Sequence, residues 1–385
     1  MDPTFDDGAR ASVVRVGDPT VVSARRVDLR VLLASLIGRA ITLLAFAVSG
    51  SFAPTFGLSS ALRAWDGGHY LHIVAHGYPS AIPTTIHGPT PLTAAFFPVF
   101  PVVIRAVHDV TRLSPTLVGT VLSILAGAAT ALVFVRLARP HFGAVVAERG
   151  AILFAVFPGS VVLTMVYAEG LLLLFTALCL LALVHRRWVL AGALGALATA
   201  TRPIALALVV SAVWLAYRAT TGRDRRGALL AAAMTPVGPL GYFGYLWAHT
   251  GSPITWFTVQ HLGWNQHIDF GLGFASPLRH PHYFSDPLWI MYIVGFVLLV
   301  VIVSPALRGA RLPGLLGAYV VGVLLQCLIN SGVGPRPRFL LTAFPLLLLP
   351  ASVWSTRVYR AAVVVSALGL AVASFVYVRP GLVAP

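Results

Sequence analysis

The chain has 385 residues, of which 58% are hydrophobic and 10% are charged, whereas about a quarter of the residues in a soluble globular protein are charged. This composition excludes an ordinary soluble domain and predicts an all-α polytopic membrane protein. The net charge of +15 does not indicate nucleic-acid binding, because all 27 basic residues are arginines that lie mostly in short clusters beside apolar segments, as the positive-inside rule describes.

The N-terminal part of the chain is expected to contain a tail and the first spanning helix. Residues 1–30 are polar, and because the apolar stretch begins so late they predict a disordered cytoplasmic tail and not a signal peptide. Residues 31–52 predict a helix of about 33 Å, long enough to cross the hydrocarbon core of about 30 Å. Arg39 interrupts this helix and either faces the bundle or pairs with a lipid phosphate.

A long loop, residues 53–91, follows and contains Trp65-Asp66-Gly67-Gly68-His69-Tyr70. Within it, residues 65–76 predict a short amphipathic helix on the membrane surface. Asp66 is one of only 12 acidic residues, and a carboxylate against a membrane is costly to place. It is therefore a candidate catalytic base at the mouth of the helix bundle. The alternative is an ordinary loop, with Trp and Tyr as interfacial anchors and Asp-Gly-Gly as a turn.

The rest of the chain is expected to complete a single transmembrane domain over residues 31–378, with a short tail at 379–385. An apolar segment at 92–110 contains Phe96-Phe97-Pro98-Val99-Phe100-Pro101. The other apolar segments lie at about 116–138, 150–166, 169–185, 189–217, 228–247, 288–306, 313–330, 338–355 and 359–378. The run 189–217 is too long for one ordinary crossing and contains Thr201-Arg202-Pro203, so we expect a break there.

The distribution of arginine predicts which connections share a side of the membrane. The predicted cytoplasmic side carries the arginine clusters at 136–149, 186–187, 218–226, 308–311 and 357–360. The predicted outer side carries the connections at 53–91, 249–287 and 331–338. An odd number of crossings must separate the loop of Asp66 from the first cluster, yet two apolar segments lie between them. Either 92–110 enters the membrane without crossing it or one cluster violates the rule, and we expect 9 to 11 helices.

Four other charged residues are candidates for function. Glu169, in Tyr167-Ala168-Glu169, lies at a predicted turn, where it either acts chemically or simply begins a helix. Arg202 lies inside an apolar run, where an unpaired charge costs a few kcal/mol, so it should face a cavity, an anion or Glu169. Arg336 and Arg338 lie on the predicted outer side against the positive-inside bias, which favours a phosphate ligand over a role as helix anchors.

The outer loop 249–287 is rich in aromatic, amide and histidine side chains, among them Gln260, Trp264, His280 and His282. Aromatic and amide groups suit sugar binding and the membrane interface equally. The histidines do not show the tight spacing with carboxylates that is typical of metal sites, so the sequence identifies no metal ligands.

Several segments together resemble a known family. Arg63-Ala64-Trp65-Asp66-Gly67-Gly68-His69-Tyr70, then Ile73-Val74-Ala75-His76-Gly77-Tyr78, then Phe96-Phe97-Pro98-Val99-Phe100-Pro101 resemble the first luminal loop of GPI mannosyltransferase 2, the PIG-V family, which has relatives in actinobacteria. Phe157-Pro158, Tyr167-Ala168-Glu169, Thr201-Arg202-Pro203 and Arg338-Phe339 follow in the order expected of that family. Family members often have Ser or Thr where this chain has Ala168, which removes a hydroxyl group but leaves Glu169 in place.

The resemblance implies a GT-C glycosyltransferase. Such a multi-helix membrane enzyme takes sugars from polyprenyl phosphates on the extracytoplasmic side and needs an acidic residue in its first outer loop, the position of Asp66. The expected reaction is inverting transfer of mannose to a lipid-linked or cell-envelope acceptor at a bacterial plasma membrane. Some members of the class use a divalent cation, so a metal is left open here, and no nucleic acid is expected as a partner.

The expected roles follow from this reaction. Asp66 would be the general base, and Arg202 with Arg336 or Arg338 would stabilise the phosphate leaving group. The residues expected to shape the sugar pocket or support the site are Trp65, His69, Tyr70, Glu169, Gln260 and Trp264. Two alternatives remain: a lipid-sugar transporter or flippase, with Arg202 and Glu169 lining its pathway, and a non-catalytic partner of another glycosyltransferase.

Overall fold

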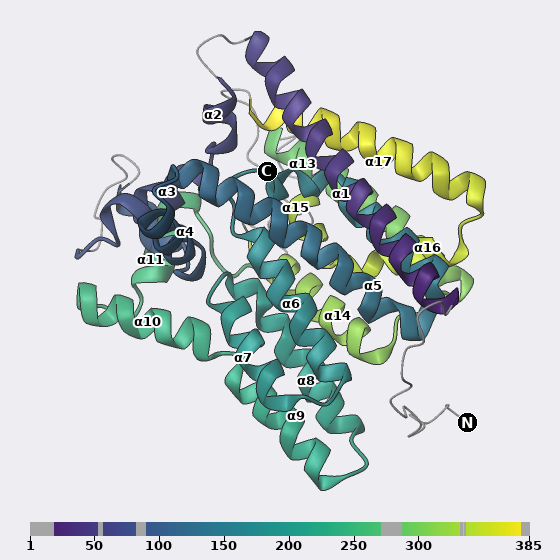
Figure 1. Ribbon diagram of the computed structural model, residues 1–385. Coiled ribbons are helices and arrows are strands. Elements are labelled where there is room, and N and C mark those ends of the chain that lie inside the picture. The colour runs from purple at the N-terminus through teal and green to yellow at the C-terminus, as the bar shows by residue number, and fades with distance from the viewer. Residues whose placement is uncertain are drawn as a thin grey trace.

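The protein is represented by a computed structural model, which describes residues 19–52, 57–81, 90–270, 287–331, 334 and 336–378. Within these ranges every regular element is a helix, apart from one isolated antiparallel bridge between Ile268 and Asn330. Five of the described helices are long and apolar enough to cross a membrane, and shorter apolar helices pack among them (Figure 1). The predicted all-α polytopic membrane fold is therefore confirmed.

The first helix, α1 (Pro19–Ser51), begins earlier than the sequence predicted. The expectation of a disordered tail over residues 1–30 is therefore wrong for residues 19–30, while residues 1–18 lie outside the described residues. The charges of this extension have partners on α5 (Pro115–Val156), because Arg136 pairs with Asp28 at 2.9 Å and Arg30 with Glu148 at 3.2 Å. Charged residues that looked like a solvated tail instead continue the helix.

Arg39, in the middle of α1, faces the bundle and not the lipid. Its side chain is 6% exposed, and Nη2 donates hydrogen bonds to the carbonyl oxygen of Ala155 at 3.0 Å and to Ser160 Oγ at 2.8 Å. Of the two alternatives for Arg39, the structure supports the first. The guanidinium joins α1 to the end of α5 and to the segment that follows it.

The element α5 is a helical hairpin. Gly143 has φ 77° and ψ 170°, outside the helical region, and the rings of Phe134 and Phe154 are 6.3 Å apart. A straight helix would separate residues twenty positions apart by about 30 Å, so the chain must reverse at Gly143. The arginine cluster 136–149 therefore spans the turn between two predicted apolar segments. The second arm ends at Val156 and not at 166, because a 3-10 helix, η2 (Pro158–Leu163), begins there.

The apolar segment 92–110, which either crosses the membrane or only enters it, forms η1 (Thr90–Ala95) and α4 (Val99–Thr111). With 13 residues, α4 is about 20 Å long, which is shorter than the hydrocarbon core of a bilayer. This length favours the alternative in which 92–110 enters the membrane without crossing it. The short helix predicted at 65–76 in the preceding loop is present as α3 (Asp66–His76), and its position on the membrane surface stays a prediction.

Three breaks in the helical structure lie close to the candidate site. The run 189–217 divides, as predicted, into α7 (Trp188–Thr199), η3 (Pro203–Leu206) and α8 (Ala207–Arg218). The other two breaks are η2, before α6 (Glu169–Val184), and α15 (Pro337–Thr342), before η7 (Phe344–Leu347) and α16 (Leu348–Val353). Each of η2, η3 and α15 begins with proline, and the residue before each proline has extended backbone. Proline cannot donate a backbone hydrogen bond and disfavours a helical residue before it, which explains the breaks.

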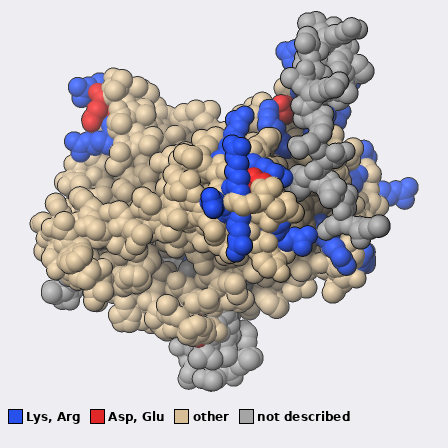
Figure 2. All heavy atoms as spheres, turned by 90° about the horizontal axis from the view of Figure 1, so that it is seen from below, with Lys and Arg blue, Asp and Glu red and all other residues tan. Residues whose placement is uncertain are grey.

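The remaining helices complete the bundle around these breaks. They are α2 (Leu58–Leu62), α9 (Gly222–Met234), α10 (Val237–Thr250), α11 (Thr255–Trp264), α13 (Pro287–Val303), η6 (Ser304–Arg308), α14 (Gly314–Ile329) and α17 (Thr356–Tyr377). Seen from below the view of Figure 1, the molecule displays groups of arginine side chains with few acidic side chains between them (Figure 2). A surface of this kind is what the predicted arginine-rich side of the membrane requires.

Candidate active site

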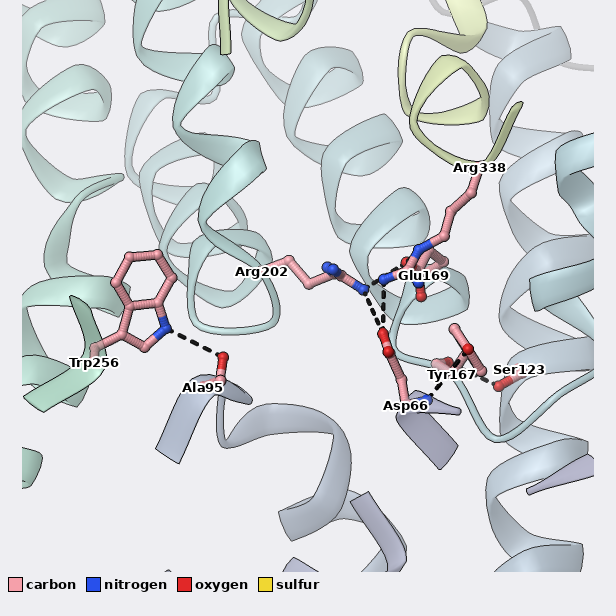
Figure 3. Close-up of polar contacts among 8 residues, drawn as sticks. All are labelled: Asp66, Ala95, Ser123, Tyr167, Glu169, Arg202, Trp256 and Arg338. Atoms are coloured by element: carbon pink, nitrogen blue, oxygen red, sulfur yellow. Dashed lines mark hydrogen bonds and ion pairs between the residues drawn. The ribbon is translucent and has the colours of Figure 1, made fainter. Parts of the chain in front are cut away.

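Four charged side chains from distant parts of the chain meet at the breaks (Figure 3). Asp66 Oδ2 accepts hydrogen bonds from Arg338 Nη2 at 2.7 Å and from Arg202 Nη1 at 3.4 Å. Glu169 Oε1 accepts from Arg338 Nε at 2.6 Å and from Arg202 Nη1 at 2.6 Å. Each arginine therefore bridges both carboxylates, and the prediction that Arg202 faces Glu169 or a cavity is confirmed.

Burial divides this cluster into an inner and an outer pair. The side chains of Glu169 and Arg338 are 2% and 6% exposed, whereas those of Asp66 and Arg202 are 16% and 21% exposed. Buried charges are tolerated only when opposite charges and hydrogen bonds compensate their loss of hydration, and here each charge has two opposite neighbours. The inner pair thus forms the base of the cluster, and the outer pair is the part that a ligand could reach.

Both carboxylates stand at the first residue of a helix, Asp66 in α3 and Glu169 in α6. The positive end of the helix dipole favours a carboxylate at this position. Asp66 is also fixed through its backbone, since its N–H donates to Tyr167 Oη at 3.3 Å. The Tyr167 ring lies under the guanidinium of Arg338, with 5.0 Å from Cζ to the ring centroid. Tyr167 therefore contacts both the candidate base and the buried arginine.

The residue before Asp66 has an unusual backbone. Trp65 has φ 57° and ψ −121°, a region that residues with a Cβ rarely adopt and that costs on the order of 1–3 kcal/mol. Its indole Nε1 donates to the carbonyl oxygen of Tyr377, at the end of α17, at 2.6 Å. Trp65 thus holds the start of α3 in place and is absent from the residues that line the cavity described below.

The position of Arg338 depends on a close approach of two backbones. A Cβ on Gly159, in η2, would overlap the backbone of Pro337 and Arg338. We therefore expect Gly159→Ala to lower the free energy of unfolding by about 1–3 kcal/mol, because overpacking displaces α15. Thermal unfolding in detergent measures the effect. The matched control is Gly244→Ala in α10, where a Cβ would meet nothing within 4 Å and alanine favours the helix. Equal stability of the two variants would contradict the proposed contact.

The electrostatic environment keeps Asp66 ionised. Burial alone would raise the pKa of its carboxyl group, but the guanidinium groups of Arg338 and Arg202 outweigh burial and hold the pKa below its ordinary value of 3.8. Asp66 is therefore a carboxylate at neutral pH and can accept a proton. Both arginines contact the same oxygen atom, Oδ2. The second oxygen, Oδ1, makes none of these contacts.

Asp66 and Arg202 line a cavity of about 490 Å³. Five other predicted site residues also line it, namely Tyr70, Gln260, Trp264, Arg336 and Arg338. Besides Trp65, two predicted residues support the site from outside the lining. Glu169 lies behind the two arginines, and the ring of His69 stacks on Phe96 at 4.8 Å and lies 6.1 Å from the ring of Trp264. His280 and His282 lie outside the described residues.

The structure adds lining residues that sequence reasoning did not single out. They are mostly aromatic or carry side-chain amides: Phe96, Phe97, Phe243, Trp256, Phe257, Gln266, Gln326 and Asn330. The wall at 94–96 is fixed by hydrogen bonds, because the carbonyl oxygens of these residues accept from Tyr242, Trp256 and Tyr78 at 2.9, 3.1 and 2.8 Å (Figure 3 shows the bond of Trp256). The aromatic and amide content of the loop 249–287 gave a signal for Trp256, Phe257 and Gln266, but the sequence did not indicate which side chains face the cavity.

The described residues provide no group of three or more His, Cys, Asp or Glu side chains that could hold a metal ion. The two nearest carboxylates, Asp66 and Glu169, are already bridged by two guanidinium groups. Positive charge at this site is supplied by arginine.

No protein-family model matches the sequence, and a search of the curated proteins finds no significant match. The structure is similar to the crystal structure of ArnT from Cupriavidus metallidurans bound to undecaprenyl phosphate, with a TM-score of 0.52 and 17% identity over 92% of this chain and 64% of that chain. The similarity to the Archaeoglobus fulgidus oligosaccharyltransferase tethered with an acceptor peptide has a TM-score of 0.45 and 12% identity, over 91% of this chain and 54% of that chain. The likeness to ArnT shows a GT-C-type fold. The chain spans less than two thirds of the length of ArnT.

Proposed function

We propose that this protein is a membrane glycosyltransferase that transfers mannose from a polyprenyl-phosphate donor to a lipid-linked or cell-envelope acceptor, with inversion at the anomeric carbon. The observation that carries the proposal is an ionised Asp66 on the wall of a cavity that also holds Arg202, Arg336 and Arg338. This combination provides a base for a hydroxyl group and cations for a phosphate. The choice of mannose rests on the resemblance of the first outer loop to the PIG-V family.

A lipid-linked donor is favoured by the way the cavity opens. Its lining includes Leu240 of α10 and Phe257 of α11, whose side chains are 65% and 53% exposed. In a membrane protein such exposed apolar side chains face lipid, so an acyl or prenyl chain could enter between these helices while its phosphate reaches the arginines. The similar structure of ArnT contains undecaprenyl phosphate, a ligand of this kind.

The three arginines are not equivalent in this proposal. Arg338 is almost fully buried and holds both carboxylates, so its main role is to position Asp66 and Glu169. Arg202 is more exposed and its contact to Asp66 is longer, at 3.4 Å, which makes it the better candidate for a phosphate ligand. Arg336 lines the same cavity and packs on the rings of Tyr292 and Phe339, at 5.6 and 5.0 Å.

The proposed reaction is a single displacement. The acceptor hydroxyl oxygen forms a bond to the anomeric carbon while its proton moves to the Asp66 carboxylate. The bond from the anomeric carbon to the phosphate oxygen breaks, and its electron pair stays on the phosphate. The released lipid phosphate gains negative charge, which Arg202 and Arg336 would stabilise without reorganising. Glu169 stays outside the reacting atoms and fixes the two arginines that border Asp66.

The lowered pKa of Asp66 makes a prediction about pH. The pKa of Asp66 lies below its ordinary value of 3.8, so Asp66 should not produce an acid limb in the profile of kcat/KM above that pH. In Arg202→Gln one opposing cation is gone, the pKa of Asp66 rises, and the acid limb should move to higher pH. The profile of both proteins between pH 4 and 9 tests this. An acid limb near neutral pH that is identical in the two would contradict the assignment of Asp66.

The proposal as a whole is tested by transfer of radiolabel from polyprenyl-phosphate mannose to a membrane lipid extract, with purified protein in detergent or vesicles. Formation of labelled glycolipid would support it. Movement of the labelled donor across a vesicle membrane without a new glycosidic bond would instead support the flippase alternative. We place the reaction at the extracytoplasmic face of a bacterial plasma membrane. Protection of the site from a membrane-impermeant reagent added outside inverted vesicles would support this side, and modification there would contradict it.

A further inference from the structure

Side-chain amides are rare in this protein and are gathered at one place. The whole chain contains three glutamines and two asparagines, and all five lie between residues 260 and 330. Four of them, Gln260, Gln266, Gln326 and Asn330, line the cavity that contains Asp66. A chain that uses almost no amides elsewhere therefore presents four of its five to a single space.

The fold brings these four residues together from the ends of two helices, α11 and α14, and from the residues that follow them. Gln260 lies in α11, and the chain turns after it so that the N–H of Gln266 donates to the carbonyl oxygen of Gln260 at 3.3 Å. The following residues pair with the end of α14 through the bridge between Ile268 and Asn330. Gln326 lies in the last turn of α14, and Asn330 directly follows the last residue of this helix. Four residues from two separate parts of the chain thus reach one cavity.

Three of the four amides have hydrogen-bonding capacity that the protein does not use. Gln326 Nε2 donates to the carbonyl oxygens of Ile204 at 3.0 Å and Gly322 at 3.2 Å, so it anchors η3 next to Arg202. The side-chain amides of Gln260, Gln266 and Asn330 make no hydrogen bond with any residue that the structure describes, and all three residues are partly buried. Each carries two N–H donors and a carbonyl acceptor, a set that matches the hydroxyl groups of a sugar.

The charges of the cavity favour a neutral sugar over an amino sugar. Asp66 is the one carboxylate among its lining residues, and Arg202 and Arg338 already neutralise it. The ammonium group of an amino sugar would find no free acidic partner here. Neutral hydroxyl groups can form hydrogen bonds with uncharged amides, so no charged group has to lose its hydration. The aromatic rings of Trp256 and Trp264 supply the apolar surface against which the carbon face of a sugar packs.

We propose that Gln260, Gln266 and Asn330 form a subsite for the hydroxyl groups of a neutral sugar ring. The proposal rests on the proposed function and adds the residues that would recognise the sugar. The same chemistry could serve the sugar of the donor or a sugar of the acceptor. These sources are distinguished by comparing undecaprenyl phosphate, undecaprenyl-phosphate mannose and a membrane lipid extract as probes.

The test uses a double variant, Gln266→Met with Asn330→Leu, which keeps the size of the side chains and removes their polar groups. The matched control is Asn265→Gly, which removes the fifth amide from the same turn but does not touch the cavity. Asn265 has φ 49°, a conformation that glycine adopts easily, so this control should fold normally. Equilibrium binding of the two lipids and the amount of extract that half-saturates transfer are measured for each protein.

A donor subsite predicts that the double variant binds undecaprenyl phosphate as the wild type does but binds undecaprenyl-phosphate mannose about tenfold more weakly, as expected for two lost hydrogen bonds. An acceptor subsite predicts unchanged binding of both lipids and about a tenfold larger half-saturating amount of extract. A double variant equal to the wild type in all three measurements would overturn the amide subsite alone. Loss of undecaprenyl phosphate binding by the double variant would also overturn it, since the amides would then support the phosphate site or the fold. A wild type that bound neither lipid would overturn the proposed donor as well.

Discussion

Asp66→Asn is expected to lower the rate of sugar transfer by about 10³-fold while tightening the binding of undecaprenyl phosphate. The rate falls because an amide cannot take the proton of the acceptor hydroxyl, and a general base typically contributes 10²- to 10⁴-fold. Binding tightens because Arg202 and Arg338 lose the carboxylate that neutralises them at 3.4 and 2.7 Å. Single-turnover transfer and equilibrium lipid binding measure the two effects on the same sample.

Opposite signs for rate and affinity make this prediction specific. A variant that simply misfolded would lose both. The control is Asp109→Asn in α4, whose ion pair with Arg105 is 3.5 Å long and half-exposed, and which should leave both quantities unchanged. Transfer by Asp66→Asn at the wild-type rate would move the search for the base elsewhere. If a complex with another glycosyltransferase kept its full activity with this variant, the non-catalytic alternative would be favoured.

The sequence predicted the parts of the site that are rare in an apolar chain. Asp66 and Arg202 stand out because a charge within apolar surroundings needs a compensating partner, and the structure supplies one in each case. The break at Thr201-Arg202-Pro203 was also predictable, since the run was too long for one crossing and proline interrupts helical hydrogen bonding. These features depend on local composition, which a single sequence contains.

Pairings over long distances in the chain could not be predicted in this way. Arg338 meets Glu169 across 169 positions, and the sequence did not indicate that it would join Arg202 at this carboxylate. Trp65 was expected to shape the sugar pocket or hold its loop. The bond from its indole to the last turn of α17, 312 positions away, fits the second alternative, but its partner was not predictable. The four amides of the cavity are a different case. The scarcity of Asn and Gln is visible in the sequence, but only the fold shows that four of the five line one cavity.

The second large effect is expected from the buried arginine. Arg338→Gln should lower the free energy of unfolding by about 3–5 kcal/mol, because it leaves Glu169, 2% exposed, with one of its two cationic partners and removes the shorter contact to Asp66. Thermal unfolding in detergent measures the loss. Arg202→Gln should be less destabilising, since Arg202 is more exposed and hydration can partly replace its contacts. Equal losses in the two variants would contradict the division into an inner and an outer pair.

A double variant separates the effect on folding from the effect on chemistry. Glu169→Gln retains Oε1 as an acceptor for the arginines and places its amide nitrogen where Glu169 Oε2 has no hydrogen-bond partner among the described residues. Combined with Arg338→Gln, it removes the uncompensated buried charge, so the double variant should unfold at a higher temperature than Arg338→Gln alone. Transfer should stay low, because Asp66 has still lost the guanidinium that fixes Oδ2 at 2.7 Å. If stability did not recover, packing around Arg338 and not charge pairing would hold the cluster together. If transfer recovered together with stability, Arg338 would act only through the fold, and the positioning of Asp66 would have to come from Arg202 and Tyr167.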